Sequence, residues 1–296
     1  MRLVRRSKRR VASTSKRKVK PKKQPLPTRS IAVKTTSNPY LSLQSSTPLP
    51  SISVILSAQN EEDSIGAVLS EVSRLPIQEI IIVLNGCTDG TYGIARTYPL
   101  AKIIHYPDPI GHDVGRAIGA KMASSDILLF VDADIPITAQ DLMPFVQAIH
   151  QGVDVALNDI NPYLSTFDRR DDLSRCKEFL NRSLGRRDLT VNSLTAIPHA
   201  LSRKAMETIG YTYLMVPPKA QAIAILKGLR VEVCTSVNVV ERNKIRKTNV
   251  GQTNPVAELI IGDHLEAIRE AMDICGSRLA LTDNQRNHIA ARRNRR

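Results

Sequence analysis

Three polar clusters in this sequence follow apolar runs of strand length, and their residue types suit cation and anion binding. Two of the clusters occupy residues 57–62 and 85–91, and the third is the pair Asp132 and Asp134. Carboxylates separated by one residue offer hard oxygen ligands, which Mg²⁺ and Mn²⁺ prefer. Such a cation can neutralise the charge of a departing diphosphate. One cluster alone could simply cap a following helix, but three in this order indicate a site.

The clusters need a scaffold that brings them together, and the apolar pattern predicts one. Short β-branched runs at residues 52–56, 79–84, 102–105 and 127–131 alternate with segments of helical periodicity. This alternation is typical of an α/β fold with a mostly parallel sheet. Ligands of such sheets bind at the carboxyl ends of the strands, so we expect all three clusters at one edge.

Helical signals support this scaffold. Apolar residues recur at helical spacing after the first and fourth expected strands, with Asp63 and Thr138 as the expected N-caps and Asp141 completing a capping box. Gly115 and Gly119 leave one helical face bare, which allows close approach to the sheet or to a phosphate. Later helices are expected near residues 202–209, 218–227 and 256–272.

Taken together, the three blocks resemble family 2 glycosyltransferases. The similar residues are 54–62, 85–91 and 111–135, within a stretch that extends from about residue 52 to about residue 158. The resemblance implies a GT-A fold, which is a Rossmann-like, mostly parallel twisted sheet with flanking helices. It also implies a divalent-metal-dependent hexosyltransferase that uses a UDP- or GDP-sugar, and it leaves the acceptor undefined.

The same resemblance implies roles for residues of the donor site. Asp134 is expected to bind the metal, Asp132 to bind metal or donor ribose, and Glu61 to contact the nucleoside. Family members end the second strand with two aspartates, the first of which reads uracil, whereas this chain has Leu84 and Asn85. The identity of the base is therefore open. The further expected donor contacts are Ser57, Gln59, Asn85 and Asp89.

Residues 111–134 also resemble, without a gap, a segment of retaining glucosyl-phosphoglycerate synthases. In this alignment His112 takes the place of a phosphate-contacting lysine, and Arg116 lies one helical turn later. Either could hold the diphosphate, or both could be solvated helix residues. Glu241 falls where the synthases carry a metal-binding histidine. His264 is the alternative metal ligand, although its apolar neighbours favour an ordinary core histidine.

The catalytic base is less defined than the donor site. Inverting relatives present an acidic pair before a late helix, but residues 213–224 contain no carboxylate here. Asp159 is the candidate catalytic residue, and Asp188 is a similar acid in a loop. A retaining reaction needs no such base, so inversion and retention are both open. A family member that binds a nucleotide sugar without transferring it is an alternative function.

Charge divides the chain into a basic tail and a neutral body. Of the 42 Lys and Arg residues, 14 precede Glu61, which is the first acid, so the remainder carries 28 bases and 28 acids. The tail has few large apolar residues and is expected to be disordered, with residues 1–34 contacting an anionic membrane or polyanion. The expected divisions are residues 1–50 for the tail, 51–160 for the donor half, 161–275 for the acceptor half, and 276–296 for a C-terminal helix and basic end.

Composition argues against several other classes of protein. The four cysteines form no CxxC pair, which disfavours a zinc ribbon and a disulfide framework. No apolar run approaches the roughly 20 residues of a membrane span, so we expect a cytoplasmic protein, peripheral at a membrane through its tail. A nucleic-acid-binding protein acting through the tail is the rival, but a neutral body with 4% aromatic residues offers little stacking surface.

Deleting residues 1–50 is expected to leave donor affinity unchanged and to reduce binding to anionic vesicles at low salt. The attraction of Lys and Arg to anionic headgroups is screened by salt, so the difference between the two proteins should vanish at about 1 M salt. Vesicle sedimentation and calorimetric titration with a nucleotide diphosphate measure the two properties. Equal vesicle binding at low salt would contradict the lipid interaction.

Overall fold

The computed structural model describes residues 50–240, 255–281 and 293, so residues 1–49 of the expected tail and Glu241 lie outside the described residues. Seven strands form one sheet in the order β3-β2-β1-β4-β6-β5-β7. The strands are β1 (Ile52–Ala58), β2 (Glu79–Asn85), β3 (Ala101–Tyr106), β4 (Ile127–Phe130), β5 (Val155–Asn158), β6 (His199–Ser202) and β7 (Val231–Thr235).

Most neighbouring strands of the sheet run parallel. β1 pairs in parallel with β2 and β4, β2 with β3, and β5 with β7, whereas β6 runs antiparallel between β4 and β5. β5 therefore points in the same direction as β4, and the carboxyl ends of β1, β2, β4 and β5 meet at one edge. The expected mostly parallel α/β fold is confirmed.

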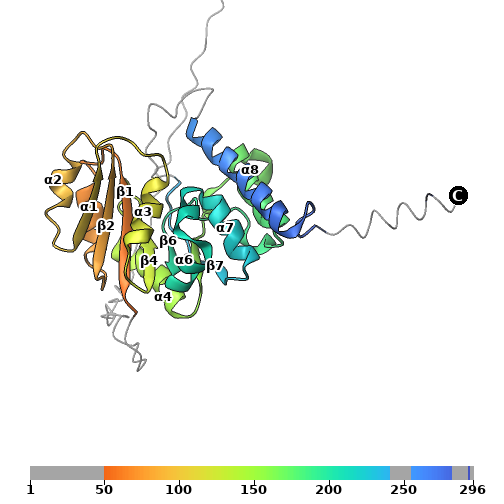
Figure 1. The fold of residues 1–296 in the computed structure, drawn as a ribbon, viewed down its shortest axis with the longest axis horizontal. Helices are drawn as coiled ribbons and strands as arrows, with labels where there is room; N and C mark the ends of the chain where they lie inside the picture. The colour runs from red at the N-terminus through yellow and green to blue at the C-terminus, as the bar shows by residue number, and fades with distance from the viewer. Residues whose placement is uncertain (1–49, 241–254, 282–292, 294–296) are drawn as a thin grey trace, which may run out of the picture. The chain divides into compact units, whose positions relative to one another are not determined.

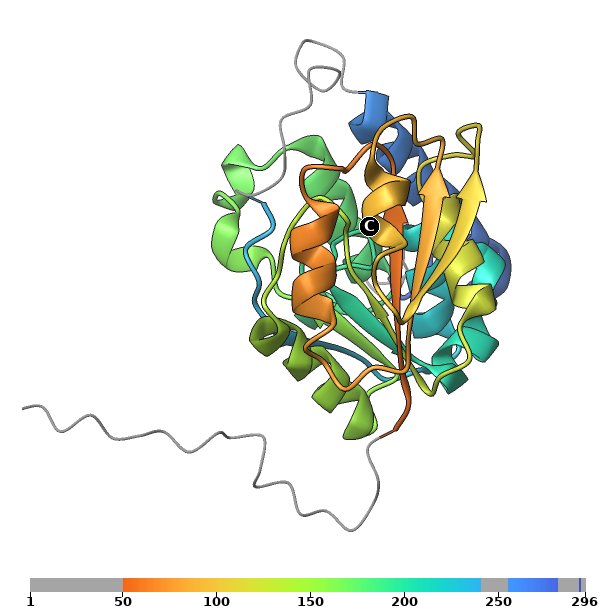
Figure 2. The same ribbon diagram turned by 90° about the vertical axis from the view of Figure 1, so that its left-hand side faces the viewer.

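Helices cover both faces of the sheet, and a further helical layer lies outside one of them (Figures 1 and 2). α1, α2 and α4 cover one face, α3, α6 and α7 cover the other, and α5 and α8 pack on the outside of α7. The helices are α1 (Ile65–Val72), α2 (Thr91–Ala95), α3 (Val114–Met122), α4 (Ala139–His150), α5 (Asp172–Ser183), α6 (Arg203–Ile209), α7 (Pro217–Leu226) and α8 (Pro255–Cys275). Short 3₁₀ turns are η2 (Asn161–Tyr163), η3 (Phe167–Arg169), η4 (Arg187–Leu189) and η5 (Tyr211–Met215).

The uninterrupted apolar sequence of β2 follows from burial of both its faces. Ile80 and Ile82 pack under α1, whereas Ile81 and Val83 pack under α3, because successive side chains of a strand point to opposite faces. Among the described residues, no helix is both long and apolar enough to cross a membrane.

One expectation for helix ends is wrong, and one is confirmed. α1 begins after Ser64 rather than after Asp63, and no side chain caps it, because the Glu61 carbonyl accepts the amides of Ser64 and Ile65 instead. Thr138 caps α4 as expected, accepting the Asp141 amide at 3.2 Å. Residues 276–281, assigned to a C-terminal helix, form a turn after α8 has ended. Residue 293 is helical, the rest of that assignment lies outside the described residues, and the C-terminal helix stays a prediction.

A buried carboxylate joins three segments at the amino edge of the sheet. Glu79, which is 2% exposed, accepts hydrogen bonds from the Ser53 hydroxyl at 2.5 Å, the Ser124 amide at 2.8 Å and the Lys102 ammonium at 2.5 Å. Burial raises the pKa of this carboxyl, but the hydrogen bonds outweigh burial and lower the pKa to about 2. Glu79 therefore stabilises the fold as a carboxylate.

Replacing Glu79 with Gln is expected to lower the free energy of unfolding at neutral pH by roughly 3 kcal/mol, which corresponds to a pKa falling from 4.5 to about 2 on folding. Because the folded pKa is the lower one, this contribution is complete above pH 4.5 and disappears as the pH falls toward 2. Urea unfolding at several pH values measures the difference. Glu207→Gln, on the exposed side of α6, is the matched control and should change stability little.

Candidate functional site

The carboxyl edge of the sheet brings the three predicted polar clusters together. The first cluster extends from the end of β1, the second from the end of β2, and Asp132 follows β4 by two residues. β1 lies between β2 and β4 and is parallel to both, so all three clusters leave the sheet on the same side. The juxtaposition expected from the strand pattern is present in the structure.

Arg116 of α3 is the cation at the centre of this edge. Its guanidinium lies 2.9 Å from an oxygen of Asp113 and 3.5 Å from an oxygen of Asp132. Burial raises the pKa of Asp132, Arg116 opposes this effect, and the negative charges of Asp134 and Asp113 reinforce it. Carboxylates that repel one another across a short distance favour a bound cation, and their hard oxygens suit Mg²⁺ or Mn²⁺. Asp132 and Asp134 therefore fit a divalent metal.

Two glycines let α3 approach β1 closely enough to place Arg116 there. A Cβ on Gly115 would collide with the Ser57 hydroxyl and lie 2.8 Å from the Ser57 Cβ. A Cβ on Gly119 would lie 2.5 Å from Ile55. The bare face expected from the sequence thus packs on the sheet, and Ser57, a predicted donor contact, lies beneath α3.

Hydrogen bonds join the first two polar loops, residues 57–62 and 85–91. The Thr91 hydroxyl accepts the amide of Glu61 at 2.9 Å, and Asp89 accepts the amide of Glu62 at 3.0 Å and the hydroxyl of Thr91 at 2.5 Å. Burial raises the pKa of Asp89, but these hydrogen bonds outweigh it and lower the pKa. Asp89 therefore braces the loop that presents Glu61, which is 4% exposed. Donor contacts by Glu61 and Asp89 stay predictions.

Asn85 fixes the turn that leads into α3. Its side-chain oxygen accepts the Ile110 amide at 2.7 Å, and its side-chain nitrogen donates to the Gly111 carbonyl at 2.8 Å. This turn carries His112, whose imidazole is exposed one helical turn before Arg116. Gln59 is exposed on the first loop. The expected donor contacts of Asn85, His112 and Gln59 also stay predictions.

Glu241 and His264 are the two predicted alternatives for a third metal ligand. Glu241 lies outside the described residues. His264 is 1% exposed within the helical layer, its Nδ1–H donates to the Ile260 carbonyl at 2.6 Å, and burial lowers its pKa to about 4. Over residues 50–240 and 255–281, no three His, Cys, Asp or Glu side chains converge as a metal cluster. The Nε2 atom of His264 is buried without a hydrogen-bond partner among the described residues, and metal binding by His264 stays a prediction.

Sequence reasoning missed a buried histidine beside the central arginine. His199, at the start of β6, is 1% exposed and packs on Phe130 with ring centroids 4.8 Å apart. Its Nδ1 lies 3.2 Å from the Ala196 carbonyl, which can only accept, so Nδ1 carries the proton. Burial and the nearby Arg116 charge lower its pKa to about 3, so this ring is neutral. Only the strand pairing, which the sequence did not reveal, brings it here.

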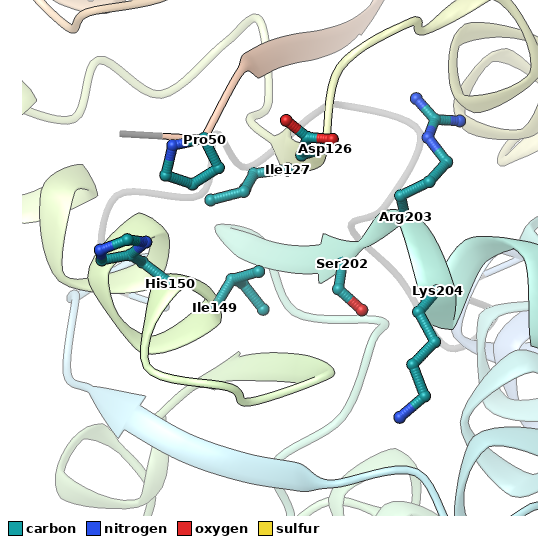
Figure 3. A pocket seen from close by; sticks show the side chains of 8 residues that line it. All are labelled: Pro50, Asp126, Ile127, Ile149, His150, Ser202, Arg203 and Lys204. Atoms are coloured by element: carbon teal, nitrogen blue, oxygen red, sulfur yellow. The ribbon is translucent and has the colours of Figure 1, made fainter. Parts of the chain in front are cut away.

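A pocket at the opposite, amino edge of the sheet is lined by side chains that bond to neighbouring segments of the fold (Figure 3). It encloses about 290 Å³ between the starts of β4 and α6. Its charged side chains already have partners: Arg203 donates to the Ala123 and Ser125 carbonyls, Lys204 pairs with Asp154 at 3.2 Å, and Asp126 accepts from Ser51. The charged groups of this pocket therefore serve the fold.

A family model described as "Glycosyl transferase family 2" matches residues 53–210, which is more than half of the chain. The chain belongs to glycosyl transferase family 2. The match covers the three polar loops, α3 and the sheet through β6. The expected family is confirmed, and the protein is a glycosyltransferase by family.

Individual family 2 relatives match shorter stretches of the chain. Glucosyl-3-phosphoglycerate synthase of Mycolicibacterium paratuberculosis is 34% identical over 98 residues, which is 28% of each protein. A 4,4'-diaponeurosporenoate glycosyltransferase of Staphylococcus aureus is 31% identical over 96 residues, 31% of this chain and 26% of the relative. The chain thus matches under a third of the length of these relatives.

A solved structure extends the similarity to most of the fold. Glucosyl-3-phosphoglycerate synthase from Mycobacterium tuberculosis, in complex with Mn²⁺, UDP and phosphoglyceric acid, superposes with a TM-score of 0.54. The alignment covers 74% of this chain and 78% of that chain at 18% identity. Identity this low concerns the fold, and the expected GT-A fold is confirmed.

Gly115→Ala is expected to destabilise the protein by about 1–3 kcal/mol, since the added methyl group forces α3 away from Ser57. Adding Ser57→Gly should restore part of the loss, because it removes the atoms that collide. Thermal unfolding of the single and double variants measures this coupling. Gly93→Ala in α2, where a Cβ meets nothing within 4 Å, is the control and should leave the melting temperature almost unchanged.

Proposed function

We propose that this family 2 protein transfers a sugar from a nucleotide-diphosphate sugar, with Mg²⁺ or Mn²⁺ held by Asp132 and Asp134. The observation that carries the proposal is the group of carboxylates at the carboxyl edge: Asp113 and Asp132 both contact the guanidinium of Arg116, and the charge of Asp134 raises the pKa of Asp132. The carboxylates of such a site attract a cation and the guanidinium attracts a phosphate, so a metal-bound diphosphate matches both charges. The relative from M. tuberculosis, which binds Mn²⁺ and UDP, supports the same ligand class.

Different residues of this edge bind different parts of the donor. When bound, the divalent cation offsets the charge that builds on the diphosphate as the bond to the sugar breaks. Arg116 and His112 supply donors toward the phosphates, since a guanidinium pairs well with phosphate oxygens. Glu61 contacts the nucleoside from the first loop, next to Ser57 and Gln59. Asn85 and Asp89 hold the loops in place.

UDP-sugars are the first donors to test, and GDP-sugars are the second. Leu84 takes the position of the family's uracil-reading aspartate, and the amide of Asn85 beside it is bonded to the 110–111 turn, so the end of β2 does not select uracil over guanine. A thermal-shift panel of nucleotide diphosphates and nucleotide sugars, with and without Mn²⁺, identifies the donor, because a ligand bound only by the native state raises the melting temperature.

A binding protein without transferase activity is the second function considered. It is favoured by one observation: residues 213–224, where inverting relatives place an acidic pair, contain no carboxylate. Release of free nucleotide from a bound nucleotide sugar separates the two functions. We also propose a cytoplasmic location, with residues 1–34 contacting anionic membranes or polyanions through their positive charge.

Asp134→Asn is expected to abolish the strengthening of UDP binding by Mn²⁺ while leaving the protein folded. The amide keeps the shape of the carboxylate but loses its charge, and loss of a direct ligand should weaken metal binding by roughly 100-fold or more. Calorimetric titration with UDP, with and without Mn²⁺, measures the effect. Asp273→Asn, exposed on α8, is the control of equal charge change. Unchanged metal dependence in Asp134→Asn rules out the assigned metal site.

A further inference from the structure

Asp159 lies on the same edge of the sheet as the proposed metal ligands. It directly follows β5, and β6 alone separates β5 from β4, which leads to Asp132. Neighbouring strands lie about 4.8 Å apart, so the ends of β4 and β5 are roughly 10 Å apart. This spacing leaves room for one sugar ring between the diphosphate and Asp159.

The Asp159 carboxylate is held on one side and open on the other. Its Oδ1 accepts three hydrogen bonds, from the Asn161 amide at 3.1 Å, the Asn161 side chain at 2.8 Å and the Asn192 side chain at 3.0 Å. Its Oδ2 accepts none within the part of the chain that the structure describes, and the residue is only half-buried. Asp159 therefore presents one oxygen in a fixed direction.

The support behind Asp159 is unusually polar for a protein interior. Asn181, Asn192 and Gln221 are each at most 1% exposed, and they bond to one another and to the backbone of residues 190–194. Thr190 adopts a φ of 49°, which is unfavourable for a β-branched residue, and its hydroxyl donates to Asn161 at 2.8 Å. The hydrogen bonds offset the cost of burying these amides, and strained backbone of this kind is often found at functional sites.

Three other polar side chains that sequence analysis or position makes candidates, Asp188, Lys219 and Gln221, already have partners. Asp188, the second acid considered from the sequence, forms a bidentate pair with Arg186, with distances of 2.6–3.2 Å. Lys219 of α7 pairs with Glu266 and Glu270 of α8 at 2.9 and 3.0 Å. Gln221 belongs to the buried network. Asp159, by contrast, keeps one carboxylate oxygen without a hydrogen bond from the described residues.

We infer that Asp159 is the catalytic base that activates the acceptor, an assignment that rests on the proposed sugar transfer. Oδ2 takes the proton of an acceptor hydroxyl while the hydroxyl oxygen bonds to the anomeric carbon. The bond from that carbon to the diphosphate oxygen breaks, and its electron pair leaves with the nucleotide diphosphate. The activated hydroxyl attacks the anomeric carbon from the face opposite the departing diphosphate, and this displacement inverts the anomeric configuration.

Two small acceptors test this role without knowledge of the natural acceptor. Methanol must lose a proton when it attacks, whereas azide has no proton to lose. With the nucleotide sugar that gives the largest thermal shift, Asp159→Ala should lower methanol-dependent nucleotide release by about 100-fold or more, the usual contribution of a general base. Azide-dependent release should stay within about threefold of the wild type. The methyl glycoside made by the wild type should have inverted configuration.

Controls separate this inference from a loss of fold or of function. UDP titration of Asp159→Ala checks that the donor site is intact, and Asp159→Asn is measured in parallel in case the alanine variant does not fold. Asp188→Ala, which removes an acid already paired with Arg186, should leave both rates unchanged. Equal losses with methanol and azide, no loss with either, or a retained configuration would each overturn the assignment. Absence of nucleotide release by the wild type from any bound donor would instead refute sugar transfer itself.

Discussion

The site of this protein depends on how closely α3 lies against β1. At Gly115 the two elements leave no space for even a methyl group, because Ser57 occupies it. This contact fixes the depth of the helix, and the depth fixes where the guanidinium of Arg116 meets Asp113 and Asp132. The Asn85 amide sets the start of the same helix by holding residues 110 and 111. The packing of α3 on β1 thus determines where the positive charge of Arg116 lies at the carboxyl edge.

The two edges of the sheet handle buried charge in opposite ways. At the amino edge, Glu79 and Arg203 have hydrogen-bond partners on neighbouring segments, which makes them part of the fold. At the carboxyl edge, Asp113 and Asp132 share one arginine, and burial together with the charges of Asp134 and Asp113 raises the pKa of Asp132. The amino edge thus uses its charged groups to join segments of the fold, whereas the raised pKa of Asp132 fits the binding site proposed at the carboxyl edge.

Much of this arrangement could be predicted from the sequence, because its signals are local. Apolar runs followed by polar clusters predicted the strands, their common edge and the positions of Asp132 and Asp134. The first turn of α1 was mispredicted, since the carbonyl of Glu61 does the capping expected of the Asp63 side chain.

Contacts between distant segments were beyond the sequence pattern. Nothing in the sequence shows that Asp89 braces the first loop or that Asn181 and Gln221, which are 40 residues apart, share a hydrogen bond at 2.7 Å. Such pairings depend on which strand and which helix become neighbours. The antiparallel position of β6 between β4 and β5 brought His199 beside Arg116 and Asp159 to the common edge, and the periodicity of the sequence carried no sign of it.

The internal hydrogen bonds of Asn85 have a consequence for redesign of donor preference. Since the chain itself satisfies both ends of this amide, Asn85 would contribute shape to the proposed base pocket rather than a hydrogen bond. Substitution at Asn85 would release the turn before α3 and disturb the phosphate side along with the base side. An engineer who wishes to exchange one nucleotide for another should therefore vary the exposed first loop around Gln59, where a change of side chain leaves the supporting turn intact.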